Sequence, residues 1–156
     1  MAGETTDQAD YLAADSEPRP SDELSADAVR VLGHARVLII EDDTLLAMSA
    51  ELLLSDYVEA VVGIAATADD AVDIARRLKP DIALIDVTLT GRTDGVDAAR
   101  VIGGELSIPC LFVTARVDPK SRGRMVSVPH YAGVLFKPYQ PRQLIETVAA
   151  ALGAKP

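Results

Sequence analysis

Five short, largely apolar runs alternate along this sequence with segments of helical periodicity, and this alternation limits the folds open to the chain. The runs are rich in branched residues and lie at residues 37–40, 58–65, 82–85, 109–114 and 132–136. Continuous apolar runs of this length are typical of strands buried on both faces of a sheet. Strands joined by helices form parallel sheets that are covered on both sides. We therefore expect an α/β fold with a doubly wound, five-stranded parallel sheet.

The segments between the runs predict the helices. Apolar residues recur at helical spacing over residues 44–56, 69–79, 94–106 and 141–152. In the first segment, the residues that indicate an amphipathic helix are Leu45, Leu46, Met48, Leu52, Leu53 and Leu54. Residues 115–131 contain two prolines and a glycine that disfavour a helix, so the fourth helix should be short or replaced by a loop.

The first 34 residues differ in composition from the rest of the chain. Residues 1–30 hold eight of the 24 acidic residues and two of the 15 basic residues. The first twenty residues contain few large apolar groups, so we expect an acidic, largely disordered extension over residues 1–34. A short helix can form within it over residues 22–34, with Ser21 as its N-cap. The folded domain is expected over residues 35–156.

Composition argues against several classes of protein. The formal net charge of −9 disfavours broad electrostatic binding to nucleic acid or anionic lipid, since both require a basic face. Cys110 is the one cysteine in the sequence, so neither an intrachain disulfide nor a cysteine-rich zinc site is possible. No apolar run approaches the ~18 residues of a membrane span, and the N-terminus lacks a signal-peptide pattern. We expect a soluble, cytoplasmic protein.

Polar residues stand at the ends of four of the five runs. Glu41 and Asp42 follow the first run, Asp86 follows the third, Thr114 ends the fourth, and Lys137 follows the fifth. In an open parallel sheet these strand ends share one edge, where ligands bind. Clustered carboxylates favour a hard cation such as Mg²⁺, and a cation beside Asp86 keeps that carboxylate ionised as a nucleophile. Because Lys137 and Thr114 can pair with phosphoryl oxygens, the set predicts an aspartate that accepts phosphate reversibly.

Five motifs make the chain resemble the receiver domains of two-component response regulators. In order along the chain they are RVLIIEDD (36–43), PDIALIDVTL (80–89), DGVDAA (94–99), CLFVTA (110–115) and LFKPY (135–139). The resemblance implies a CheY-like, flavodoxin-like receiver domain with five parallel strands in the order 2-1-3-4-5. It also implies that Asp86 is the phosphoacceptor.

The same resemblance implies the metal ligands of the site. Glu41 and Asp42 stand at the positions of the acid pair that holds Mg²⁺ together with Asp86. The pair is Glu-Asp rather than Asp-Asp, a variant with which we expect metal binding to survive. The backbone carbonyl of Thr88 would be a further ligand.

The remaining site residues agree with the family pattern in part. The resemblance implies that Thr114 is the switch hydroxyl and that Lys137 pairs with phosphate, with a bond to Pro138 that is usually cis in such domains. Thr90 stands where many receivers have proline, and the loop from Asp86 to Asp94 is one residue longer than usual. Val134 occupies the aromatic switch position, so the usual aromatic swing lacks its side chain.

The strand end at residues 112–115 and the weak fourth helix resemble the atypical "FATGUY" receivers of alphaproteobacteria. Arg116 departs from that pattern, because the FATGUY motif has glycine there. The one basic cluster of the chain lies in the same region, and we interpret it either as a solvated loop or as a mobile lid or docking surface beside the crevice. Its residues are Arg116, Lys120, Arg122 and Arg124.

The resemblance implies a stand-alone response regulator that a histidine kinase or phosphotransferase phosphorylates on Asp86. We expect output by protein–protein contact, or a role as phosphorelay intermediate or phosphate sink, from a monomer or weak homodimer without a DNA-binding output domain. Such a protein signals and is not an enzyme in the ordinary sense. Two alternatives stay open. One is a non-phosphorylated pseudo-receiver that serves as an interaction module. The other is a small phosphohydrolase, against which Thr88 argues, because that chemistry calls for a second acid at this position.

Overall fold

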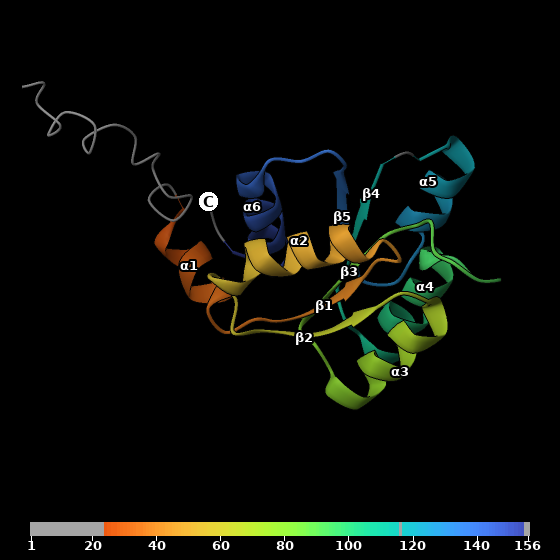
Figure 1. Ribbon diagram of the computed structural model, residues 1–156, viewed down its shortest axis with the longest axis horizontal. Helices are drawn as coiled ribbons and strands as arrows, with labels where there is room; N and C mark the ends of the chain where they lie inside the picture. Colours follow the sequence, from red (N-terminus) through yellow and green to blue (C-terminus); the bar gives the residue numbers. More distant parts are fainter. Residues whose placement is uncertain (1–23, 116, 155–156) are drawn as a thin grey trace, which may run out of the picture.

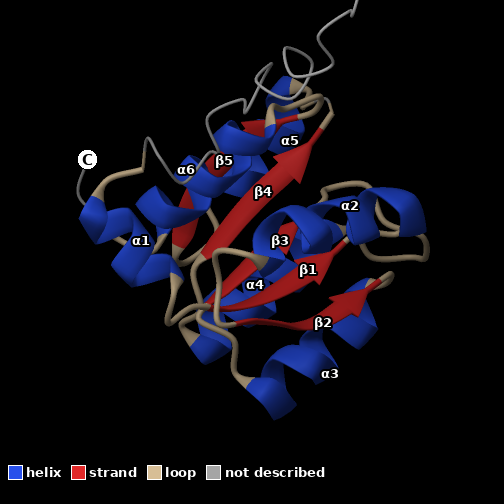
Figure 2. Cartoon of the chain, turned by 60° about the vertical axis from the view of Figure 1, so that its left-hand side comes forward, coloured by secondary structure: helices blue, strands red, loops and turns tan. Residues whose placement is uncertain are grey.

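The computed structural model describes residues 24–115 and 117–154, and within them the chain forms a five-stranded parallel sheet (Figures 1 and 2). The strand order is β2-β1-β3-β4-β5, and all four neighbouring pairs are parallel. This confirms the predicted architecture and strand order. The strands are β1 (Arg36–Ile40), β2 (Ala60–Ala65), β3 (Ile82–Ile85), β4 (Cys110–Thr114) and β5 (Tyr131–Phe136).

Helices cover both faces of the sheet. On one face, α1, α2 and α6 enclose a core with Val37, Ile39 and Leu84 of the strands. On the other, α3, α4 and α5 enclose a second core with Leu38 and Ile40. Alternate residues of β1 therefore enter different cores, which explains why the whole strand is apolar. The helices are α1 (Ala26–Leu32), α2 (Thr44–Ser55), α3 (Ala68–Leu78), α4 (Gly95–Leu106), α5 (Pro119–Val126) and α6 (Pro141–Ala151).

Helix α1 lies within the predicted segment 22–34 but begins later than expected. Its N-cap is Ser25, whose hydroxyl accepts a hydrogen bond from the backbone N–H of Ala28. The predicted cap, Ser21, lies outside the described residues. Leu32 is fully buried against the core formed with α6. This short helix is therefore packed onto the sheet domain.

Helix α2 forms where it was predicted, but most of the large apolar residues that indicated it do not lie on its buried face. The residues that α2 buries are Ala47, Ala50 and Leu54. Most of the large apolar side chains that indicated the helix point outward, with exposed fractions of 45% to 78% for Leu45, Leu46, Met48 and Leu52. Small alanines let the helix axis approach the sheet closely, so the larger side chains remain on the outer face.

Helix α5 has eight residues, in agreement with the prediction of a short fourth helix in the segment between β4 and β5. Asp118 caps it by accepting a hydrogen bond from the backbone N–H of Ser121, and Pro119 occupies its first turn, where the missing N–H is not needed. Met125 is its one buried side chain. No helix in the described part of the chain is long and apolar enough to cross a membrane.

Candidate functional site

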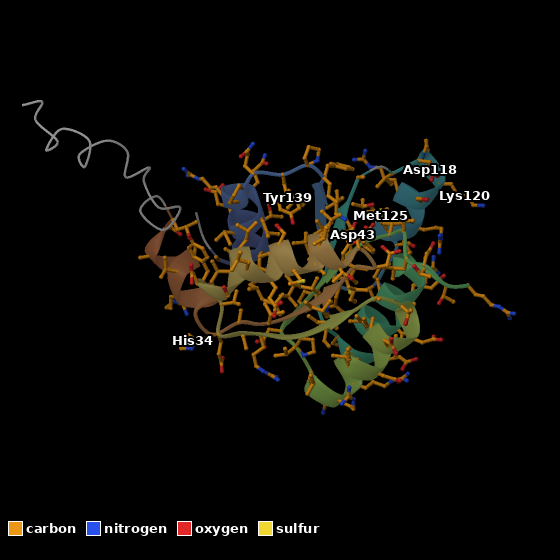
Figure 3. The ribbon with its side chains drawn as sticks, in the orientation of Figure 1. His34, Asp43, Asp118, Lys120, Met125 and Tyr139 are labelled. Atoms are coloured by element: carbon orange, nitrogen blue, oxygen red, sulfur yellow. The ribbon has the colours of Figure 1, made fainter. Side chains whose placement is uncertain are left out.

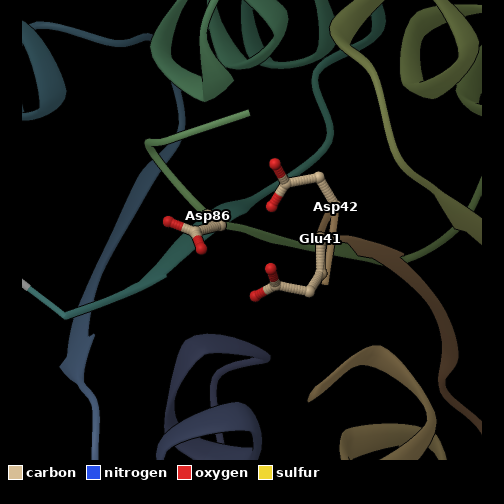
Figure 4. A group of neighbouring side chains, drawn as sticks. All are labelled: Glu41, Asp42 and Asp86. Carbon is tan, nitrogen blue, oxygen red and sulfur yellow. The ribbon is translucent and has the colours of Figure 1, made fainter. Parts of the chain in front are cut away.

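Three carboxylates meet at the carboxyl edge of the sheet. Glu41 and Asp42 follow β1, and Asp86 follows β3, the neighbouring parallel strand. The last residues of the two strands, Ile40 and Ile85, are paired in register, so the acids that follow leave the sheet at the same level. One oxygen from each carboxylate lies within 4.8 Å of the others. Figure 4 shows the three side chains around a common space. The structure thus brings together the three acids that the sequence grouped.

Lys137 lies between two of these acids. Its Nζ donates hydrogen bonds to Asp86 Oδ2 at 2.9 Å and to the carboxylate of Glu41. The exposed fractions of the side chains are 16% for Lys137, 8% for Glu41 and 12% for Asp86. The peptide bond between Lys137 and Pro138 is cis, as expected. The ammonium therefore offsets part of the negative charge from inside the cluster.

Burial and pairing act in opposite directions on the ionisation of this cluster. Burial raises the pKa of Glu41 overall, and hydrogen bonds from Lys137 and from the backbone N–H of Asp43 offset only part of that rise. For Lys137, burial lowers the pKa, but hydrogen bonds to Glu41 and Asp86 raise it overall. The amine therefore stays an ammonium at neutral pH and supplies a fixed positive charge beside Asp86.

Two threonines and a fourth acid complete the surroundings. Thr114 ends β4 and is 2% exposed, and its carbonyl accepts a hydrogen bond from the backbone N–H of Lys137. The backbone N–H of Thr88 donates to Asp86 Oδ1 at 3.1 Å. The switch role of the Thr114 hydroxyl and the metal-ligand role of the Thr88 carbonyl stay predictions. Asp43 caps α2 by accepting hydrogen bonds from its first N–H groups, as expected of an acid at that end of a helix.

The start of α4 is packed against the strand end that carries Asp86. A Cβ on Gly95 would lie 1.8 Å from the carbonyl oxygen of Asp86, and the N–H of Gly95 donates to the carbonyl of Val87 at 2.9 Å. Asp94 caps α4, because its carboxylate accepts from the N–H of Asp97 while the carboxylate of Asp97 accepts from the N–H of Asp94. This acid-x-x-acid spacing resembles a capping box and is visible in the sequence.

Arg124 of α5 holds this cap. Its guanidinium donates to Asp94 at 2.6 Å and 3.1 Å and to Asp97 at 3.1 Å. The sequence grouped Arg124 with the basic cluster of a loop, whereas the structure uses it to tie α5 to the segment that follows Asp86. Lys120, also of that cluster, is exposed on α5 (Figure 3). Arg116 lies outside the described residues.

Replacing Asp94 with alanine is expected to lower the free energy of unfolding at pH 7 by about 1–2 kcal/mol, because the helix loses its N-cap. Burial raises the pKa of Asp94, but hydrogen bonds from Arg124 and from the backbone of Asp97 lower it overall. A carboxylate with a lowered pKa stabilises the fold above its ordinary pKa of 3.8 and loses that effect as the pH falls through its folded value.

Urea unfolding at a series of pH values checks this prediction. The difference between wild type and Asp94→Ala is expected to be constant from neutral pH down to about pH 5 and to shrink below about pH 4. Asp94→Asn keeps a capping side chain but loses the charge, so it separates the cap from the ion pair with Arg124. A difference that stayed constant down to pH 2 would mean that the charge of Asp94 contributes nothing.

A valine occupies position 134, where the sequence lacks the aromatic switch side chain. Val134 is partly buried against the core and pairs with Phe112 across β4 and β5. The ring of Tyr131 packs against that of Phe112, with centroids 6.1 Å apart. Tyr139, labelled in Figure 3, lines a small cavity that reaches Asp86. Val134 has no ring to rotate.

The donor set fits a hard divalent cation. The carboxylates of Glu41, Asp42 and Asp86 offer oxygen ligands, which Mg²⁺ prefers in proteins. Asp42 is exposed, so the site is open to the water molecules that Mg²⁺ usually keeps. Three carboxylates face the single ammonium of Lys137, which leaves negative charge for a cation to neutralise. These three acids are therefore the residues that would hold Mg²⁺.

Comparison with known proteins agrees with this geometry. The family model of the response regulator receiver domain matches residues 37–149. The phyllosphere-induced regulator PhyR of Methylorubrum extorquens is 33% identical over 131 residues, which cover 83% of this chain and 46% of PhyR. The chain spans about half the length of the curated relatives it matches.

Solved structures show the same similarity. The receiver domain of the PhyR response regulator from Erythrobacter litoralis superposes with a TM-score of 0.65 and 31% identity, covering 77% of this chain and 91% of that domain. The signal receiver domain of a modulated diguanylate cyclase from Desulfovibrio desulfuricans has a TM-score of 0.71 and 32% identity, covering 76% of this chain and 94% of that domain. The PhyR relatives agree with the predicted alphaproteobacterial type.

Proposed function

Because this chain belongs to the family of response regulator receiver domains, we propose that Asp86 accepts a phosphoryl group from a histidine kinase or phosphotransferase. The observation that carries the proposal is the cluster of Glu41, Asp42 and Asp86 within 4.8 Å, with the ammonium of Lys137 at 2.9 Å from Asp86. A carboxylate that is kept ionised between cations can act as a nucleophile toward phosphorus.

In the proposed reaction, a carboxylate oxygen of Asp86 forms a bond to phosphorus as the P–N bond of phosphohistidine breaks. The electron pair of that bond stays with the departing imidazole. Lys137, already hydrogen-bonded to Asp86, shifts its donation toward a phosphoryl oxygen, and the hydroxyl of Thr114 donates to another. Glu41, Asp42, Asp86 and the carbonyl of Thr88 would hold Mg²⁺, which supplies further charge neutralisation.

Hydrolysis reverses the modification, since attack of water on phosphorus releases phosphate and restores the carboxylate of Asp86. We further propose that the protein works in the cytoplasm, through contact with another protein or as an intermediate or sink in a phosphorelay. The net charge of −9 and the acidic crevice favour a protein partner over nucleic acid.

Intact-mass measurement after incubation with Mg²⁺ and acetyl phosphate tests the proposal. Wild type is expected to gain the mass of one labile phosphoryl group, and Asp86→Asn is expected to gain none. Asp43→Asn is the matched control, because it alters a neighbouring acid of the crevice while asparagine still caps α2, and it should be modified like wild type. Absence of an adduct from both acetyl phosphate and a cognate kinase would support the pseudo-receiver interaction module instead.

A further inference from the structure

The carboxylate of Asp42 is held by a side chain from another segment. Thr90 Oγ1 donates a hydrogen bond to Asp42 Oδ2 at 2.9 Å, although the two residues are 48 positions apart. Thr90 lies in the loop that leads from Asp86 to the start of α4. The hydrogen bond therefore joins the loop after β1 to the loop after β3 at the acid cluster, of which Asp42 is a member.

The orientation of the Asp42 carboxylate depends on this one hydrogen bond, whereas the neighbouring acids Glu41 and Asp43 are held by other contacts. Glu41 is buried and paired with Lys137, and Asp43 is fixed as the cap of α2. Asp42 is exposed, and in the described part of the chain Thr90 is the side chain that hydrogen-bonds it. Without Thr90, its two side-chain torsions would be free to turn the carboxylate into solvent.

We propose that Thr90 is a positioning residue that orients Asp42 as a metal ligand, so that the Mg²⁺ affinity of this protein depends on the Thr90 hydroxyl. The inference rests on the proposed function, because it concerns the same metal site. Donors that hold metal-binding carboxylates commonly contribute tenfold or more to metal affinity. The branched side chain of threonine restricts its own rotamers, which makes it a stiff donor. Many receivers carry proline at this position, and proline has no side-chain donor.

The geometry leaves room for both interactions. A carboxylate has two oxygens with several acceptor sites, so Asp42 can accept from Thr90 and still offer a lone pair to a cation. A hydrogen bond to the charged carboxylate is also of the stronger, charge-assisted kind. Thr90 thereby lowers the conformational freedom that Asp42 must lose when it binds a cation.

Isothermal titration with Mg²⁺, with Mn²⁺ paramagnetic resonance as a second measurement, tests the proposal on the full chain. Thr90→Val keeps the shape and removes the donor, and it is expected to weaken metal binding about tenfold. Thr90→Ser restores a hydroxyl and should retain most of the affinity. The matched control is Thr93→Val in the same exposed loop, which should bind like wild type. Thermal unfolding in EDTA should be nearly equal for all four proteins, so a general loss of structure would be recognised.

A double-mutant cycle shows whether Thr90 acts through Asp42. In an Asp42→Asn background, Thr90→Val is expected to change the metal affinity less than twofold. Equal affinity of wild type and Thr90→Val, or tighter binding by the variant, would overturn the inference while leaving the proposed function intact. A wild-type protein that bound neither Mg²⁺ nor Mn²⁺ would instead contradict the metal site itself.

Discussion

Replacement of Gly95 with alanine is expected to lower the free energy of unfolding by at least about 3 kcal/mol, the upper part of the range for overpacked sites, and to displace Asp86. The added Cβ would lie 1.8 Å from the carbonyl oxygen of Asp86 and 2.8 Å from Cγ2 of Ile85. The first obstacle is backbone, which cannot move aside as the end of a flexible side chain can. Either α4 or the end of β3 must therefore shift, and β3 leads directly into Asp86.

A second glycine of α4 separates the loss of stability from the loss of the site. A Cβ on Gly103 would lie 2.0 Å from the carbonyl oxygen of Pro129, a similar clash at the other end of the helix. Urea unfolding should show that both variants are strongly destabilised. Mg²⁺ titration under conditions where both are folded should show weakened binding for Gly95→Ala and near wild-type binding for Gly103→Ala.

The control for helix propensity is Gly123→Ala in α5, where nothing lies within 4 Å of the new Cβ. Alanine in an open helical position is expected to stabilise the protein by up to about 1 kcal/mol relative to glycine. If Gly95→Ala were as stable as Gly123→Ala, the close packing of α4 on the Asp86 strand end would be refuted.

The architecture was predictable because the apolar composition of the central strands indicates that both of their faces are buried. Residues 82–85 are all apolar and all buried in β3, and a strand of this kind can only lie inside a sheet covered on both faces. Parallel strands then bring residues distant in sequence to one edge. This is why Glu41, Asp42, Asp86 and Lys137 could be grouped before their contacts were known.

The buried face of α2 was not predictable from periodicity. Leu45, Met48 and Leu52 follow the spacing i, i+3, i+7, and so do the buried Ala47, Ala50 and Leu54. Both stripes are apolar, so the pattern indicates a helix without choosing its inner face. Which stripe is buried depends on how closely the helix axis approaches the sheet, and this distance is set by tertiary packing. A close approach places the small alanine side chains on the buried face.

The side-chain contacts that hold the loops of the site could not be predicted from the sequence either. Thr90 could be recognised as a departure from proline, but nothing in the sequence pairs it with Asp42. Likewise, Arg124 stood among four basic residues of one segment, and no local pattern selects it as the partner of Asp94. Such contacts arise from the docking of separate loops, whereas the cap formed by Asp94 and Asp97 is local and could have been found from its spacing.

Replacement of Lys137 with methionine is expected to reduce the rate of phosphorylation by acetyl phosphate on the order of 100-fold, comparable with removal of one donor from an oxyanion site. Methionine has a similar length but no charge. The transferring phosphoryl group would lose the ammonium that lies 2.9 Å from Asp86. Timed intact-mass measurements give the rate, and Lys120→Met, which removes an exposed lysine of α5, is the matched control.

The same variant is expected to be about 3 kcal/mol less stable than wild type in EDTA, because Glu41 and Asp86 are left enclosed without their shared counter-charge. Saturating Mg²⁺ should recover more stability in Lys137→Met than in wild type, since the cation no longer competes with the ammonium for the same carboxylates. Urea unfolding with and without Mg²⁺ measures both effects. Equal stabilisation of the two proteins by Mg²⁺ would mean that Lys137 and the metal act on separate groups. It would contradict the view that the ammonium neutralises, in the metal-free protein, the same carboxylates that the metal would bind.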